Sequence, residues 1–419
     1  MTPGSPTDDR FAAFRHRPFA YYFASRFLSA FASEAAVVAV GWQIYDLTRD
    51  PFDLGLIGLI VFAPSLLLIL VTGSVADRFG RRSIMLICEI VIALCIGALA
   101  FLAIRGLTSV APVFMIMLVI GIARAFHGPA AQALAPNLVP ARDLPNAIAW
   151  NSMAWQTASV VAPVTGGLLY GLAAPVPYLV ATAMLVLAAA AIVAVPKQPR
   201  RARGEPPTWT SLLAGFGYIW REKVVLGAIS LDLFAVLVGG AVALMPVFAR
   251  DVLELGPAGL GWLRAAPGIG SIVMAIFLAS RPIRRHAGMK MFVAVGLFGI
   301  ATVVFGLSKN PLVSISALAV LGAVDTISVY VRQSLVQLWT PDELLGRVSA
   351  VNSVFVGASN ELGEFRAGTM AAFIGPVPAV VIGGIGAVVI AVAWAAGFPQ
   401  LRRIQTLDRD REMAAASSG

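Results

Sequence analysis

The sequence is poor in charge, histidine and cysteine. Only 13% of its 419 residues are charged, whereas 58% are hydrophobic, and the mean hydropathy is +0.84. A typical soluble domain is about 25% charged, so most of this surface is expected to face lipid. The three histidines and two cysteines provide no group of metal ligands at the usual spacings and no nucleophile paired with a base. We therefore expect a membrane protein that is not an enzyme and holds no metal or cofactor.

Long apolar runs occupy most of the chain. A helix needs about 20 apolar residues to cross a hydrocarbon core of about 30 Å. Runs of this length are centred near Ala32, Leu66, Leu94, Val119, Thr157, Leu185, Phe234, Met274, Gly296, Val320, Ala358 and Ala387. The sequence therefore predicts an all-α membrane protein with about twelve transmembrane helices.

The net charge of +9 is concentrated in alternate loops. Basic residues cluster at 10–17, 78–82, 197–203, 281–290 and 402–403, and the intervening loops carry few. Cytoplasmic loops are the ones enriched in Lys and Arg, so both termini are predicted to be cytoplasmic, which requires an even number of spans. The same distribution argues against a nucleic-acid-binding surface.

A polar segment rich in proline and arginine divides the chain. Residues 196–223 contain the run P-K-Q-P-R-R-A-R-G-E-P-P, which is typical of a flexible linker. This linker separates two units of six spans each, at 20–195 and 224–398. Cytoplasmic segments are expected at 1–19 and 399–419.

The two units share unusual residues in register. At an offset near 201 residues, Gly121 matches Gly322, Gln132 matches Gln333, Pro140 matches Pro341 and Asn151 matches Asn352. This repetition predicts a tandem duplication that gives two bundles related by a pseudo-twofold axis, with a binding cavity between them near the membrane midplane. The alternative is chance similarity between helices rich in Gly, Ala and Pro.

A loop between the second and third spans carries a specific motif. It matches the pattern G-x-x-x-D-R-x-G-R-[RK], with its fixed positions at Gly73, Asp77, Arg78, Gly80, Arg81 and Arg82. Because Asp and Arg at helix ends can bond the termini of neighbouring helices, we expect a cytoplasmic gating loop that acts as a conformational latch. The loop lacks the G-K-[ST] ending of a Walker motif, so no ATPase is expected.

The motif makes the chain resemble the major facilitator superfamily. The likeness extends over nearly the whole sequence, and segments such as Leu263-Arg-Ala-Ala-Pro267 and Asn360-Glu-Leu-Gly-Glu364 look closest to the branch that includes the enterobactin exporter and macrolide efflux proteins. The resemblance implies the major facilitator fold, a location in the bacterial inner membrane and transport of a small molecule.

Two further motifs resemble signatures of the same family. Ala162-Pro163-Val-Thr-Gly166-Gly167 resembles the fifth-span signature associated with antiporters, with Ala158 and Ala162 in place of its first two glycines. Arg124-x-x-His127-Gly128 resembles the fourth-span pattern R-x-x-Q-G, with histidine in place of glutamine. Pro163 is expected to bend its helix.

Ionisable residues inside the spans are the candidate functional residues, because a charge at the bilayer centre costs about 2.5–3.5 kcal/mol on insertion scales. Glu34 lies near the middle of the first span, with Arg26 about 12 Å closer to the cytoplasm. A carboxylate in apolar surroundings can bind a proton on one side of the membrane and release it on the other. Glu34 is therefore predicted to couple transport to protons. The alternative is a structural hydrogen bond between helices.

Spans four and ten carry opposite charges at duplicated positions. Arg124 and Asp325 are predicted to face a shared cavity and to pair in one state of the cycle, with a static ion pair as the alternative. Asp232, near the middle of span seven, is a further acidic candidate.

Span eleven contains two acids on one helical face. Glu361 and Glu364 are three residues apart, whereas Arg366 points to another side. Either one glutamate is protonated or a partner helix supplies a cation, and we expect a role in proton handling or substrate recognition.

Together these observations predict a proton-driven exporter of a siderophore-like or drug-like small molecule. A single copy in the lipid bilayer is expected to work by rocking of its two halves. A proton-coupled importer of a small metabolite is one alternative. A receptor or scaffold that transports nothing is another, but it would need no ionisable residues at the midplane.

Overall fold

The computed structural model describes residues 10–68, 71–72, 75, 79–197, 209–283 and 285–407, and contains helices but no strands within those ranges. The first half comprises η1 (Ala12–Arg15), α1 (Arg17–Thr48), α2 (Pro51–Leu67), α4 (Arg81–Arg105), α5 (Ala111–Leu134), η2 (Ala135–Asn137), η3 (Ala141–Asp143), α6 (Leu144–Leu172) and α7 (Val176–Ala194).

The second half continues this pattern of long helices joined by short turns. It comprises α8 (Trp209–Arg221), α9 (Lys223–Gly239), η4 (Val242–Leu244), α10 (Met245–Val247), η5 (Phe248–Val252), α11 (Gly256–Ser280), α12 (Ala287–Leu307), α13 (Pro311–Trp339), α14 (Asp342–Ile374), α15 (Pro376–Gly397) and α16 (Pro399–Arg403).

Each predicted span centre falls within one of the long helices. Within the described residues, nine helices are long and apolar enough to cross a membrane. The other three long helices are α2, with 17 residues, and the more polar α6 and α14, with 29 and 33 residues. All three pack between the two halves, where lipid does not dictate their composition.

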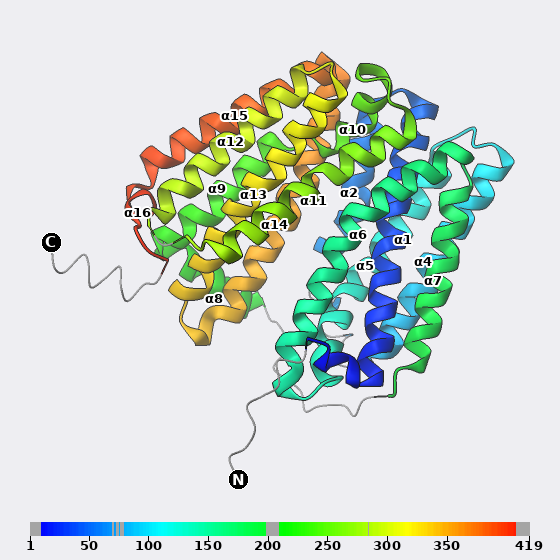
Figure 1. The fold of residues 1–419 in the computed structure, drawn as a ribbon, viewed down its shortest axis with the longest axis horizontal. Coiled ribbons are helices and arrows are strands. Elements are labelled where there is room, and N and C mark those ends of the chain that lie inside the picture. The colour runs from blue at the N-terminus through cyan, green and yellow to red at the C-terminus, as the bar shows by residue number, and fades with distance from the viewer. Residues whose placement is uncertain are drawn as a thin grey trace, which may run out of the picture.

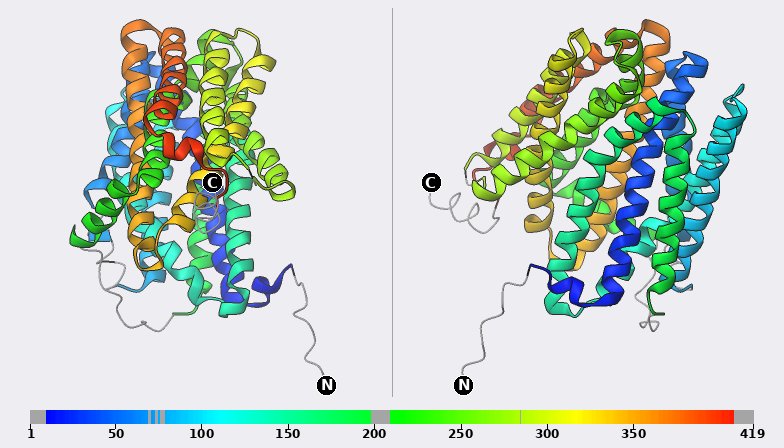
Figure 2. Two further views of the ribbon diagram at one scale, coloured as in Figure 1. Left: turned by 90° about the vertical axis from the view of Figure 1, so that its left-hand side faces the viewer. Right: turned by 45° about the vertical axis from the view of Figure 1, so that its right-hand side comes forward.

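The helices form two bundles that meet at one end (Figure 1). Helices α1, α4, α5, α6 and α7 lie on one side, and α9, α11, α12, α13 and α15 lie on the other. The bundles converge where α1 and α2 approach η4 and α10, and they diverge toward the end that holds the N-terminal residues and α8 (Figure 2, right). Contact between the bundles runs mainly through α6 against α11 and α2 against α14.

Glycines at matched positions allow close helix packing in both bundles. A Cβ atom at Gly121 of α5 would lie 2.6 Å from the carbonyl oxygen of Val61 in α2, and one at Gly322 of α13 would overlap the carbonyl of Pro267 in α11. Each glycine lets two helices of its own bundle pack closely. This repeated contact supports the duplication inferred from the sequence.

Part of the predicted linker is helical. Residues 209–221 form α8, which packs against α14. The Tyr218 hydroxyl donates a hydrogen bond to the Trp339 carbonyl at 2.6 Å, and the Phe216 ring lies 6.3 Å from that of Phe355. Aromatic residues at helical spacing give this segment an apolar face, so the expectation of a flexible linker is wrong there. The exact ends of the two six-span units remain a prediction.

The gating loop falls only partly within the described residues. Gly73, Asp77 and Arg78 lie outside them. Gly80 precedes the first turn of α4. The next two residues are arginines that bind the ends of neighbouring helices.

Arg81 and Arg82 both donate to helix carbonyls. Arg81 reaches the Ala133 carbonyl of α5 at 2.7 Å, and Arg82 reaches the carbonyls of Ile192 at 3.0 Å and Val193 at 2.6 Å in α7. A cation at the C-terminal end of a helix is favoured by the helix dipole. These contacts lie within one bundle, so a latch between bundles remains a prediction.

The fifth-span motif forms part of the seam between the bundles. A Cβ atom at Gly261 of α11 would lie 2.5 Å from the Pro163 carbonyl of α6, and one at Gly167 of α6 would overlap the Pro257 carbonyl of α11. Gly166, one position earlier, instead faces Ala35 of α1. The motif therefore brings α6 close to both α1 and α11.

We expect Gly167→Ala to loosen the seam, because its methyl group would overlap backbone that cannot rotate away. Overpacking of this kind costs about 1–3 kcal/mol, so the melting temperature of the purified protein should fall by several degrees. Gly171→Ala on the same helix is the matched control, since nothing lies within 4 Å of its Cβ position. Equal melting temperatures for the two variants would show that the seam is not tightly packed.

Candidate functional site

A charged cavity lies between the two bundles and has a volume of about 200 Å³. Its charged lining residues are Glu34 of α1, Arg124 of α5, Arg264 of α11, and Glu361 and Glu364 of α14. Helices from both halves of the chain thus contribute to one shared space. An adjoining space of about 330 Å³ shares Arg124 and Glu361 with it.

The acids and bases of the cavity interact with one another. Glu361 is close enough for electrostatic interaction with Glu364, Arg124 and Arg264. Glu364 interacts in the same way with Arg264 and Glu34. Three carboxylates therefore share two guanidinium groups.

A glycine makes room for the two acids of α14. A Cβ atom at Gly58 of α2 would lie 2.9 Å from Glu361 Oε2 and 3.5 Å from Glu364 Oε2. The missing side chain allows both carboxylates to lie directly against the backbone of the opposite bundle. Any larger residue at this position would displace at least one of them.

A partner helix supplies a cation beside these acids. Arg264 of α11 was not selected from the sequence, although a lone arginine in an apolar span was a usable signal. Its Nε atom is buried and has no hydrogen-bond partner within the described part of the chain. Arg366 points elsewhere, as expected, and donates to the Leu237 carbonyl of α9 at 2.9 Å.

The predicted candidates Glu34, Arg26 and Arg124 all lie along this central region. Glu34 and Arg124 line the cavity itself, and Arg26 lines the adjoining space beside His127. Glu34 also lies close enough to Glu364 for the two carboxyl groups to interact electrostatically.

The predicted sharing of a cavity by Arg124 and Asp325 is not found in this structure. Asp325 lines a separate small space between α9, α12 and α13, together with Asp232 and Ser328. The nearby cation is Arg332, whose NH2 lies 3.4 Å from Asp232 Oδ2. Arg332 stands seven residues, or two turns, after Asp325 and so lies on the same helical face. The duplication therefore predicted which helix carries Asp325, but not which side chains surround it.

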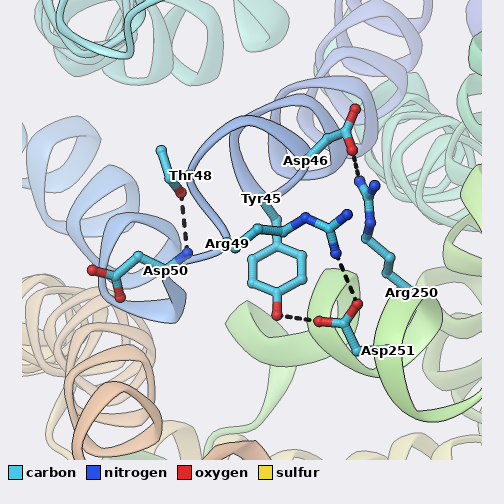
Figure 3. Close-up of polar contacts among 7 residues, drawn as sticks. All are labelled: Tyr45, Asp46, Thr48, Arg49, Asp50, Arg250 and Asp251. Atoms are coloured by element: carbon cyan, nitrogen blue, oxygen red, sulfur yellow. Dashed lines mark hydrogen bonds and ion pairs between the residues drawn. The ribbon is translucent and has the colours of Figure 1, made fainter.

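Polar side chains close the end where the bundles converge (Figure 3). The Tyr45 hydroxyl donates to Asp251 Oδ2, and Arg49 NH1 lies 3.2 Å from Asp251 Oδ1. Arg250 pairs with Asp46, and its guanidinium lies 5.5 Å from the centre of the Trp42 ring. We call Tyr45, Asp46, Arg49, Arg250 and Asp251 the outer cluster. It joins the end of α1 to η5 and was not predicted from the sequence.

A charged cavity between two helical bundles, closed at one end, is the architecture of a membrane transporter. The chain matches the sequence profile described as Major Facilitator Superfamily over residues 22–363 and belongs to that family. The predicted family and fold class are therefore confirmed.

Curated relatives and solved structures agree with this assignment. The chain is 27% identical to the enterobactin exporter EntS of Shigella boydii serotype 18, over 93% of this chain and 94% of that protein. The same values hold for EntS of Escherichia coli O157:H7. The fold of the present chain is similar to that of a bacterial homologue of the human lysosomal transporter Spinster, in its inward-facing and occupied conformation. The TM-score is 0.72 and the identity 16%, over 96% of this chain and 98% of that one. The nucleoside transporter NupG gives a TM-score of 0.67 at 14% identity, over 91% and 99%.

We expect Asp251→Asn to weaken closure by the outer cluster, because it removes the charge that binds Arg49 and accepts from Tyr45. If the substitution removes about 1–2 kcal/mol of the free energy that favours the closed state, the population of the open state rises about 5–30-fold. The measurement is the rate at which a membrane-impermeant maleimide labels Val37→Cys, a cavity position, in a background without native cysteines.

Reagent is added from the side of the outer cluster, and the labelling rate should rise by about 5–30-fold. Glu254→Gln, three residues from Asp251, provides a control that removes a nearby charge outside the cluster. A rate that stays at the parent value in Asp251→Asn would show that these contacts do not hold the outer end closed.

Proposed function

We propose that the protein is a proton-coupled exporter of a small organic molecule, siderophore-like or drug-like, that works by alternating access. The observation that carries this proposal is the charge of the central cavity, which is lined by Glu34, Glu361 and Glu364 together with Arg124 and Arg264. Among these lining residues, carboxylates outnumber guanidinium groups by three to two.

The excess acid resides on one bundle. The first bundle contributes one acid and one base, whereas the second contributes Glu361 and Glu364 against Arg264 alone. An uncompensated carboxylate is costly to bury, so the site favours binding of either a proton or a cationic group of the substrate. Exchange of protons for substrate requires that the two compete for the same carboxylates.

The direction of transport is supported by two observations. The curated relatives are named exporters, and the fifth-span motif with Pro163, Gly166 and Gly167 resembles that of antiporters. The bundles diverge on the side of the N-terminal residues (Figure 1), which we place in the cytoplasm on the basis of the basic loops. An exporter loads its cargo from that side.

The cargo class follows from the relatives and from the cavity. A site with both carboxylates and guanidinium groups can hold polar groups of either charge, and its apolar walls include Val37, Val40, Leu54 and Ile57. This combination suits an amphipathic molecule. The site is complete within one chain, which supports function as a monomer.

We expect a pH gradient to drive cargo uptake into inside-out vesicles, with enterobactin and a macrolide as the cargoes tested. Glu361→Gln and Glu34→Gln should each lower gradient-driven uptake by about tenfold or more, because each removes a carboxylate that can exchange a proton. Uptake without a gradient should change less.

Glu343→Gln is the matched control, since Glu343 is exposed at the start of the same helix as Glu361. Retention of the full gradient dependence in both cavity variants would remove these carboxylates from coupling. Uptake by the native protein that ignores the gradient would contradict proton-coupled export itself.

A further inference from the structure

A second polar cluster lies inside the first bundle, away from the outer cluster and the seam. Glu89 of α4 is fully buried, and its Oε1 atom accepts a 2.6 Å hydrogen bond from the hydroxyl of Ser25 in α1. The same oxygen lies 3.5 Å from Nε2 of His127 in α5. Glu89 Oε2 has no hydrogen-bond partner among the residues that the structure describes. Neither Ser25 nor Glu89 was selected from the sequence.

The surroundings of Glu89 offer His127 as the partner for its charge. The other titratable side chains within three positions of these contacts are Tyr22 and Arg26 on α1, Cys88 on α4 and Arg124 on α5. Tyr22 donates to the Ala131 carbonyl. The two arginines line the central spaces.

Because Glu89 is buried, the free energy of the pair depends strongly on its protonation state. An ionised carboxylate sealed from water with no cation costs several kcal/mol. Either His127 carries a proton and the two groups form an ion pair, or the carboxyl group itself carries the proton and both are neutral. Each arrangement requires one proton to be held by the pair.

His127 connects this buried acid with the central region. Its side chain is only 9% exposed, and it lines the space that also contains Arg26, Ser65, Arg124 and Glu361. Glu361 also lines the charged cavity. The imidazole thus stands between a sealed carboxylate and the space in which substrate and protons are proposed to bind.

We propose that Glu89 and His127 form a second proton-binding site, which is loaded and emptied through the central cavity by way of His127. In the transfer, the Nε2–H bond of the imidazolium breaks and an O–H bond forms on the Glu89 carboxyl group, so an ion pair becomes a neutral pair. The Ser25 hydroxyl holds the carboxyl group in place. This site goes beyond the cavity carboxylates and relies on the proposed function only for its use in the transport cycle.

A purely structural role would instead make the cluster a fixed hydrogen-bonded tie between α1, α4 and α5. The two roles differ in whether His127 gains and loses a proton under the influence of Glu89. The chain has three histidines, His16, His127 and His286, so their ring signals can be followed individually by NMR in full-length protein labelled at histidine. The probe is the proton, and no cargo is needed.

We expect the His127 signal, assigned by its loss in His127→Asn, to titrate between about pH 5 and 9. Glu89→Gln keeps an acceptor for Ser25 but removes the charge, and should move the midpoint by about one pH unit. His16 provides the matched comparison, since its Nε2 lies 2.9 Å from Asp143 Oδ2. Its midpoint should respond to Asp143→Asn and not to Glu89→Gln.

A second variant tests the proposal even if Glu89→Gln fails to fold. Ser25→Ala removes the hydrogen bond to Glu89 without changing any charge, and should also move the His127 midpoint. A His127 signal that does not titrate, or midpoints that stay unchanged in both variants, would overturn the proposal. Because the titration involves no transport, it can succeed even if the vesicle experiment fails, and the two proposals are thus tested separately.

Discussion

The structure depends on the high cost of burying a charge without its counter-charge. The central cavity holds three acids and two bases, and neither bundle encloses them alone. Glu361 and Glu364 of the second bundle lie against Gly58 and near Arg124 of the first. When the bundles move apart or together, the surroundings of these carboxylates must change with them. In the proposed function, movement of the bundles is therefore linked to the binding of protons or charged cargo in a way that an apolar cavity would not permit.

The contacts between bundles are of two kinds, and the difference bears on how they separate. Along the seam, Gly167 and Gly261 bring backbone against backbone, which gives tight packing but no charged bonds to break. In the outer cluster, Arg49 and Asp251 are 54% and 38% exposed, and exposed pairs of this kind contribute about 1 kcal/mol or less. The contacts of the outer cluster are thus several and individually weak, which agrees with the alternating access proposed above.

The fold could be predicted from the sequence because its determinants are local. Apolar run length and loop charge place each helix, and the match of Gly121 with Gly322 identified the repeat that the packing against Val61 and Pro267 now supports. The candidate site was predicted only in part. Glu34, Arg124, Glu361 and Glu364 do line one cavity, but the neighbours of Asp325 depend on helix rotation, which spacing between halves does not determine. Arg264 and Glu89 were not predicted. Arg264 is a single arginine with no acid at the matched position to draw notice to it, and Glu89 lies near the start of its helix and not at a span centre.

Each bundle also contains a polar cluster of its own, and the two clusters differ in chemistry. In the second bundle, Asp232 pairs with Arg332, a guanidinium that keeps its proton at any physiological pH. In the first, Glu89 contacts His127, an imidazole that can release one. In the proposed rocking of the bundles, both clusters stay inside their own bundle. The cluster with a histidine is the one that borders the space shared with Glu361. In the proposal above, a proton held by Glu89 and His127 responds to the state of the cavity, whereas the charge of Arg332 stays fixed.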